Sequence, residues 1–256
     1  MFRDPISAVT VCVGYGDFLR ESVKWDRHHF DKWVVVTSPT DEETREVCRA
    51  NHLTCLVTED GARDGEFSKG RLIERGLQQL PADSWVVHKD ADTVLPARFR
   101  HLLDVAHLRP ECIYGCDRYM VKSWEKWQAL VAAGWVHSAL LGHPHSVGAP
   151  YGLEVGCRWV GPDGYVPIGF FQMWHRTSGT EEWKGTRVRP YPLSHGSACR
   201  TDVQFALQWD RRDRLLIPEL FVAHLESEPA PVGANWKGRT TKRFGPEHKT
   251  VGKAVS

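Results

Sequence analysis

The chain lacks long apolar runs and a strong net charge of either sign. Its 256 residues include 33 Lys and Arg against 32 Asp and Glu, which gives a formal net charge of +1. Proteins that coat nucleic acid non-specifically are strongly basic, so the chain as a whole does not belong to that class. The longest weakly polar run, 129–142, contains His137 and Ser138 and is too short to span a bilayer. We therefore expect no membrane-spanning helix.

Several motifs of known chemistry are also missing. The sequence has no Walker-type phosphate loop, no Gly-x-Gly-x-x-Gly fingerprint and no nucleophile elbow. It has no apolar stretch of signal-peptide length near Met1. The seven Cys are odd in number and scattered, and none forms a Cys-x-x-Cys pair. The simplest interpretation is a cytoplasmic protein with reduced thiols.

The first half of the chain alternates between strand and helix patterns. Hydrophobic residues make up 41% of the chain, and its length suits one large domain or two small ones. Apolar runs predict strands at 8–15, 33–37, 54–58 and 84–88. Helices are expected between them at 17–29, 38–50 and 67–80. This order predicts an α/β fold with a mainly parallel central sheet, whose ligands bind beyond the carboxyl ends of the strands.

The second half is less regular and rich in Gly, Pro, Trp and His. Helices are expected at 97–108, 123–133 and 202–210, and strands at 112–119, 166–175 and 215–225. From Pro229 onward the sequence predicts a loop-like tail.

Two carboxylates, Asp90 and Asp92, follow directly on the fourth predicted strand. In an extended segment residues i and i+2 share a face, so both acids can point at one site. Hard divalent cations prefer oxygen ligands and keep positions open for phosphate oxygens. A cation held there could bind a diphosphate. The alternative is a solvated loop with two acids, but the buried strand before the motif favours a site.

With these elements, Asp90-Ala91-Asp92 resembles the Asp-x-Asp motif of a GT-A fold glycosyltransferase. The likeness is to the broad family-two group and to small glycosyltransferases of phage and bacteria. It covers about 8–121 and, more weakly, 166–226. The resemblance implies Mn²⁺ or Mg²⁺ and a nucleotide-sugar donor, a UDP-sugar. Asp90 and Ala91 would contact the nucleotide, and Asp90 and Asp92 would ligate the metal.

The same resemblance implies a division of the chain into three parts. A nucleotide-sugar-binding half, 1–121, would end after the Asp-x-Asp motif. An acceptor and catalytic half of the same domain, 122–228, would follow, and a basic tail, 229–256, would end the chain.

Further donor-binding residues follow from the resemblance. Val13, Gly14 and Tyr15 match the segment that borders the base and ribose. Gly14 would allow close backbone approach and Tyr15 could stack on the base, although a plain turn is the alternative. Asp41 matches a base-binding acid only loosely, and helix capping explains it better.

Two cations also match the family. Lys69 and Arg71 precede the helix before the Asp-x-Asp strand and could meet the diphosphate. Surface salt bridges are the alternative for both.

Two late residues complete the implied site. Asp202 matches the carboxylate that serves as catalytic base in inverting members, which takes the proton of the acceptor hydroxyl. Capping of a helix is the alternative. His224 stands where such enzymes often place a third metal ligand, and two oxygens with one imidazole suit Mn²⁺. A structural His at a strand end is the alternative.

The acceptor is predicted from the tail. Residues 234–256 hold six Lys or Arg and one acid, a balance of +5. Trp236, Lys237 and Arg239 interleave an aromatic ring with cations, which suits a phosphate backbone with a stacked base. Some phage glycosyltransferases of this type modify hydroxymethylated DNA bases, so this acceptor is expected, in a bacterial host cytoplasm if the chain is phage-encoded. The alternatives are a saccharide or glycolipid acceptor, or a solvated tail that folds over the active site or stays mobile.

Two other classes remain as alternatives. A sugar nucleotidyltransferase would carry a Gly-rich loop with Arg and Lys after the first strand, and 13–17 lacks one. A non-catalytic nucleotide- or carbohydrate-binding module would not need all four of Asp90, Asp92, Asp202 and His224.

The eleven Trp divide into two groups. Trp33, Trp85, Trp124 and Trp127 are expected to pack in the core. The others of note fall in the irregular half and are expected to shape an acceptor cleft: Trp135, Trp159, Trp174, Trp183 and Trp236.

Overall fold

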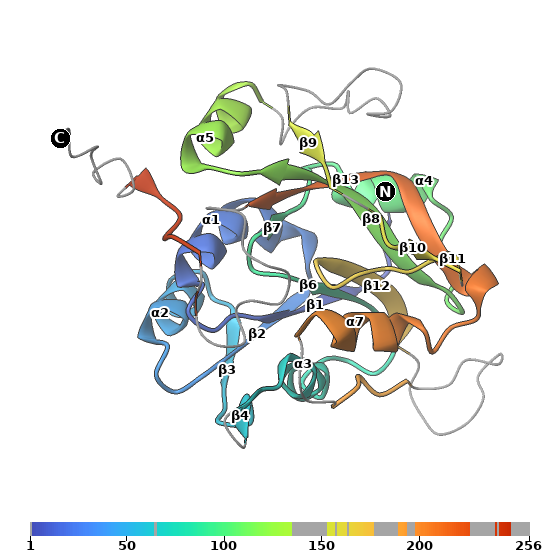
Figure 1. Cartoon of the computed structure of the whole chain (residues 1–256), viewed down its shortest axis with the longest axis horizontal. Coiled ribbons are helices and arrows are strands. Elements are labelled where there is room, and N and C mark those ends of the chain that lie inside the picture. The colour runs from blue at the N-terminus through green and yellow to red at the C-terminus, as the bar shows by residue number, and fades with distance from the viewer. Residues whose placement is uncertain are drawn as a thin grey trace.

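The computed structural model is built around one large sheet (Figure 1). It describes residues 2–63, 66–134, 153–156, 158–162, 164–176, 189–193, 198–225, 239 and 241–246. The strand order is β3-β2-β1-β6-β12-β8-β13-β7, with β9 paired to β8. The strands are β1 (Ile6–Val11), β2 (Lys32–Thr37), β3 (Thr54–Val57), β6 (Ser84–Lys89), β7 (Thr93–Val94), β8 (Ile113–Val121), β9 (Glu154–Val155), β12 (Phe171–Arg176) and β13 (Arg214–Leu225). Two small hairpins stand apart, β4 (Ala62–Arg63) with β5 (Glu66–Phe67), and β10 (Val160–Gly161) with β11 (Gly164–Tyr165).

Most of the long strands run in the same direction. β1 pairs in parallel with β2 and β6, β2 with β3, and β8 with β13. β12 lies antiparallel between β6 and β8, so β8 and β13 point the same way as β6. The carboxyl ends of β1, β6 and β13 therefore lie along one edge of the sheet, where a ligand of an α/β fold is expected.

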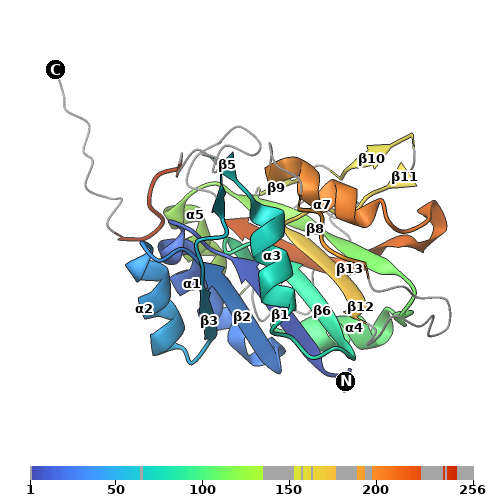
Figure 2. The ribbon, with the colours of Figure 1, turned by 90° about the horizontal axis from the view of Figure 1, so that it is seen from below.

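Helices cover both faces of the sheet (Figure 2). α1 (Gly16–Asp26), α2 (Glu42–Ala50) and α4 (Phe99–Val105) pack on one face. α3 (Lys69–Leu77) and α7 (Ala198–Ala206) pack on the other, where Leu72, Ile73 and Phe205 meet strand residues. α5 (Trp124–Ala132) covers the ends of β8 and β13 beside α1. Short 3₁₀ turns occur at Arg27–His29 and Arg211–Asp213.

The predicted fold class is confirmed, and three element boundaries need correction. The first strand ends at Val11 rather than at 15, because the chain turns at Gly14, whose φ is +72°, before α1 begins. The strand expected over 166–175 covers only Phe171–Arg176. The helix expected over 202–210 spans Ala198–Ala206, because Phe205 and Ala206 pack into the core cluster with α3.

β6 carries a fully buried charge pair. Lys89 Nζ lies 3.0 Å from Asp26 Oδ2, and both side chains are 0% exposed. The ammonium lies over the Trp33 ring, 4.7 Å from its centroid, and Asp26 Oδ1 accepts a hydrogen bond from the Leu95 amide. Burial raises the pKa of Asp26 to about 6, with Lys89 acting in the opposite direction. The pair links the last residue of β6 to the end of α1.

The tryptophan predictions are tested where the structure describes the residue. Trp33, Trp85 and Trp127 are buried, which confirms their packing role. Trp174 is also buried, against Phe205, so its expected place in a cleft surface is wrong. Trp159 is 53% exposed. Trp135, Trp183 and Trp236 lie outside the described residues.

Two further expectations concern thiols and membranes. Cys12, Cys48, Cys55, Cys112 and Cys116 are free thiols. Within the described ranges no helix has the length and apolar character that crossing a bilayer requires.

Candidate functional site

The segment Asp90-Ala91-Asp92 leaves β6 and is held by backbone contacts to distant elements. Ser22 of α1 donates its hydroxyl proton to the Ala91 carbonyl at 2.8 Å. The Leu225 amide at the end of β13 donates to the Asp92 carbonyl at 2.7 Å. The segment is therefore fixed from both sides, and the two aspartates are presented at the carboxyl edge of the sheet.

Lys69 lies in this site beside Asp90. Its Nζ is 2.5 Å from Asp90 Oδ1, and the Lys69 side chain is only 13% exposed. Burial acts to lower the pKa of Lys69, but the carboxylates of Asp90 and Asp202 outweigh it and the pKa is raised. Lys69 is therefore a cation held among carboxylates. Arg71 lies instead within electrostatic range of Asp60.

Asp202 reaches the same region from α7. It lies in the middle of Ala198–Ala206, so the alternative that it caps the start of a helix is wrong. Its Oδ2 accepts a hydrogen bond from the Gly169 amide, and its Oδ1 is buried with no hydrogen-bond partner. Burial raises the pKa of Asp202, although Lys69 opposes this. Asp202 is thus a more basic carboxylate than an exposed aspartate.

A neutral histidine lies near Asp90 in the core, with His88 Nε2 3.9 Å from Asp90 Oδ1. His88 is fully buried, and burial, followed by the nearby Lys69 charge, lowers its pKa to about 3. Its Nδ1 lies 3.4 Å from the Tyr191 hydroxyl, which donates to Gln172 Oε1 at 3.0 Å. Gln172 in turn donates to the Asp202 carbonyl at 2.9 Å. These hydrogen bonds connect the end of β6 to the middle of α7, and no local pattern in the sequence predicts them.

His224 faces Asp92 across the site. His224 Nε2 lies 3.4 Å from Asp92 Oδ1, and this oxygen is buried with no aligned hydrogen-bond donor. Burial acts to raise the pKa of Asp92, but His224 outweighs it and the pKa is lowered. β13 brings His224 here because it pairs with β7, in which Thr93 follows Asp92 directly.

Arg118, which sequence reasoning missed, selects the tautomer of a neutral His224 ring. Arg118 Nη1 lies 3.2 Å from His224 Nδ1, and its guanidinium lies 4.5 Å from the centroid of the Phe170 ring. Because a guanidinium can only donate hydrogen bonds, Nδ1 must be the acceptor. In the neutral ring the proton then sits on Nε2, which faces Asp92. His224 therefore presents an N–H, rather than a lone pair, toward the site.

The side chains around Asp92 offer some of the ligands that a hard divalent cation prefers. In the described ranges no three His, Cys, Asp or Glu side chains are gathered as a preassembled metal site. The buried Oδ1 of Asp92 lacks a hydrogen-bond donor, and Asp90 is two residues away. Carboxylate oxygens are suitable ligands for Mg²⁺ and Mn²⁺. Asp90 and Asp92 would hold the cation, whereas His224 could join only after Arg118 leaves Nδ1.

The segment Val13–Tyr15 forms the turn between β1 and α1, where Tyr15 lies within electrostatic range of Asp92. The Gly14 amide donates to Asp41 Oδ2 at 2.7 Å, and Asp41 Oδ1 accepts from the Thr44 amide, which confirms its capping role. Val13 is partly buried against the cluster formed with α3.

Arg239, expected at the acceptor, lies on this turn. Its guanidinium lies 4.9 Å from the centroid of the Tyr15 ring. Trp236 and Lys237 lie outside the described residues.

The protonation of His224 gives a direct test of the Arg118 contact. In metal-free protein we expect Nε2 protonated and Nδ1 unprotonated, because Arg118 donates to Nδ1. A long-range ¹H–¹⁵N correlation spectrum of the histidine rings distinguishes the two tautomers. Arg118→Met removes the donor, so the preference should disappear in that variant. A proton on Nδ1 of His224 in the wild-type chain would contradict the assignment.

Comparison with known proteins finds similarity in solved structures alone. No family model matches the chain, and no curated protein matches it. Mannosyl-3-phosphoglycerate synthase from Rubrobacter xylanophilus is 17% identical with a TM-score of 0.37, and the match spans 45% of this chain and 40% of that one. Glucosyl-3-phosphoglycerate synthase from Mycobacterium tuberculosis, in complex with Mn²⁺, UDP-glucose and phosphoglyceric acid, is 13% identical with a TM-score of 0.48, over 89% of this chain and 73% of that one. Similarity at this level assigns no activity to the chain.

Proposed function

We propose that the chain is a metal-dependent glycosyltransferase that moves a hexose from a UDP-sugar to an acceptor hydroxyl. The observation that carries the proposal is the convergence of Asp90, Asp92, Lys69 and Asp202 at the carboxyl edge of the sheet. These residues come from β6, α3 and α7, and all are largely buried or paired within the site. The resemblance in sequence to GT-A glycosyltransferases gives the arrangement its chemical interpretation.

In this proposal the donor diphosphate lies between the aspartates and Lys69. A divalent cation held by Asp90 and Asp92 would bind the diphosphate and stabilise the charge on the departing nucleoside diphosphate. Lys69 adds a fixed positive charge 2.5 Å from Asp90 Oδ1, in a position to exchange part of that ion pair for a phosphate oxygen. The nucleoside would lie along Gly14 and Tyr15.

Asp202 would serve as the base. As the acceptor oxygen bonds to the anomeric carbon, the bond from that carbon to the diphosphate oxygen breaks, and the hydroxyl proton passes to Asp202. The raised pKa of Asp202 makes it a better proton acceptor than an ordinary aspartate. Attack opposite the leaving group would invert the anomeric centre.

For the acceptor we propose a 5-hydroxymethylpyrimidine base in DNA, on the support of the basic tail in the sequence. Two of the tail cations are already paired within the chain, Arg239 with Asp17 and Arg243 with Glu43. Contact with DNA would therefore depend on the other tail cations, together with Trp236. The competing acceptors are a saccharide, a glycolipid precursor and a small phosphorylated acid.

Donor binding is expected to depend on the metal and on Asp92. UDP with Mn²⁺ at about 100 times its Kd should stabilise the fold by about 2.7 kcal/mol, a rise in melting temperature of roughly 5–11 °C. Asp92→Asn should abolish the part of this rise that needs the metal. Asp104→Asn, which changes an exposed acid on α4, should leave it intact.

The measurement is thermal unfolding with each nucleoside diphosphate, with and without Mn²⁺ or Mg²⁺. Failure of all of them to raise the melting temperature of the wild-type chain would refute the donor assignment.

Catalysis is expected to depend on Asp202 separately from binding. Asp202→Asn should lower the transfer rate by about 10²–10⁴-fold while the affinity for UDP stays the same, because only proton removal is lost. Asp210→Asn, which changes an exposed acid beyond α7, is the matched control. The wild-type rate should rise with pH through a pKa above that of an ordinary aspartate.

Transfer is measured by mass with a panel of UDP-sugars and acceptors. The panel holds hydroxymethylated DNA, unmodified DNA, saccharides and 3-phosphoglycerate. A gain of one hexose on the modified base alone supports the DNA acceptor, and transfer to another acceptor instead replaces it. If the donor binds but its sugar is neither transferred nor hydrolysed, the result favours a non-catalytic binding module. If the chain instead releases pyrophosphate from a nucleoside triphosphate and a sugar phosphate, the result favours a nucleotidyltransferase.

A further inference from the structure

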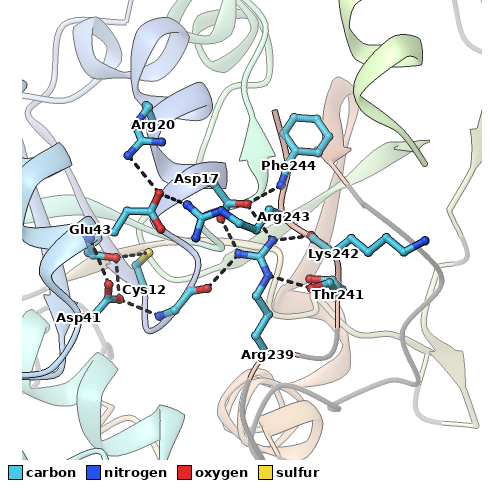
Figure 3. A network of polar contacts seen from close by, with 12 residues as sticks. Cys12, Asp17, Arg20, Asp41, Glu43, Arg239, Thr241, Lys242, Arg243 and Phe244 are labelled. Atoms are coloured by element: carbon cyan, nitrogen blue, oxygen red, sulfur yellow. Dashed lines mark hydrogen bonds and ion pairs between the residues drawn. The ribbon is translucent and has the colours of Figure 1, made fainter. Parts of the chain in front are cut away.

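The described C-terminal residues lie against the start of α1. Arg239 forms a two-point ion pair with Asp17, with Nη1–Oδ1 at 2.5 Å and Nη2–Oδ2 at 2.8 Å (Figure 3). The Asp17 side chain is only 3% exposed. Charged contacts of this bidentate kind are both strong and geometrically specific. The position of Arg239 is therefore fixed by a buried carboxylate 222 residues earlier in the chain.

The same guanidinium holds the turn that follows β1. Arg239 Nη1 donates to the Gly14 carbonyl at 3.0 Å, while the Gly14 amide donates to Asp41 Oδ2 at 2.7 Å. Gly14 has a φ of +72°, a conformation that favours glycine. Both backbone polar groups of Gly14 thus form hydrogen bonds with side chains from other parts of the chain. The conformation of the turn depends on these tertiary contacts.

Aromatic packing anchors the segment beside the turn. The Arg239 guanidinium lies 4.9 Å from the centroid of Tyr15 and 5.2 Å from that of Phe18. Phe244 is 5% exposed and stacks on Phe18 with ring centroids 4.8 Å apart, and its amide donates to Asp17 Oδ2. Arg239 therefore covers one face of Tyr15 while Phe244 holds the chain in place.

We propose that Arg239 is a positioning residue of the donor site. With Asp41 it fixes the carbonyl and amide of Gly14, and with Phe18 it fixes the ring of Tyr15, so the C-terminal segment completes the subsite for the nucleoside. This inference rests on the proposed function, in which the nucleoside of the donor lies along Gly14 and Tyr15. It gives the tail a role inside the donor site, whereas the sequence placed Arg239 at the acceptor.

The test compares two arginines of the same segment. Arg239→Gln should raise the Kd of UDP in the presence of Mn²⁺ about tenfold, and raise KM for the donor similarly, with kcat changed less than about twofold. Arg239→Lys keeps the charge toward Asp17 but cannot also reach Gly14 in the same geometry, so an intermediate Kd is expected. Arg243→Gln removes an equal charge from a side chain that is 54% exposed and pairs with Glu43, and it should leave Kd and KM unchanged.

Calorimetric titration of UDP and steady-state kinetics supply these values. Hydrogen exchange at Gly14–Asp17 should quicken in Arg239→Gln and not in Arg243→Gln. Arg239→Gln should also melt at a lower temperature than Arg243→Gln, because it leaves the buried Asp17 carboxylate unpaired, whereas Arg239→Lys keeps a charge there. Equal UDP affinity in both variants, or a loss in kcat alone, would overturn the inference and leave the proposed function intact. If the wild-type chain binds no nucleoside diphosphate, the proposed function fails and the inference falls with it.

Discussion

The buried ion pair between Lys89 and Asp26 is the constraint on which the site depends. Both side chains are 0% exposed, so each charge has lost its water and relies on the other. Removing one partner of such a pair typically costs about 3–5 kcal/mol. Because neighbouring residues of a strand face opposite sides, Lys89 on the α1 face places His88 and Asp90 on the face of α3 and α7. The face that the pair gives to Lys89 thus agrees with the face on which Asp90 contacts Lys69.

The rest of the site follows from this placement. The backbone of the Asp90–Asp92 segment is tied to α1 through Ser22 and to β13 through Leu225, so both aspartates leave the sheet at a fixed position. Lys69 and Asp202 line the site on the side of α3 and α7. His224 and Arg118 line it on the side of β13. Charges of both signs lie within one buried cluster, which is the arrangement that binding a phosphorylated anion and a cation together requires.

Local sequence patterns predicted the sheet and the position of the aspartate pair at the end of a buried strand, because buried strands are continuous apolar runs. The contacts that complete the site were beyond prediction, since Arg118 and His224 are 106 residues apart and Arg239 and Asp17 are 222 apart. No periodicity in the sequence predicts such pairings. The pairing of β8 with β13 brings Arg118 to His224, and packing of the C-terminal segment against α1 brings Arg239 to Asp17. The position of Asp202 was predicted, but its helix was misplaced, because packing of Phe205 rather than local capping sets where α7 lies.

Paramagnetic broadening of backbone amides by Mn²⁺ in the presence of UDP tests the location of the site most directly. The account predicts loss of signal at Asp90–Thr93, at His224 and Leu225, and across Gly14–Asp17. Signals around Arg109 and Asp213, which line a polar pocket at the amino ends of β8 and β13, should persist. Broadening centred on that pocket, or spread evenly over the surface, would contradict a metal and nucleotide site at the carboxyl edge of the sheet.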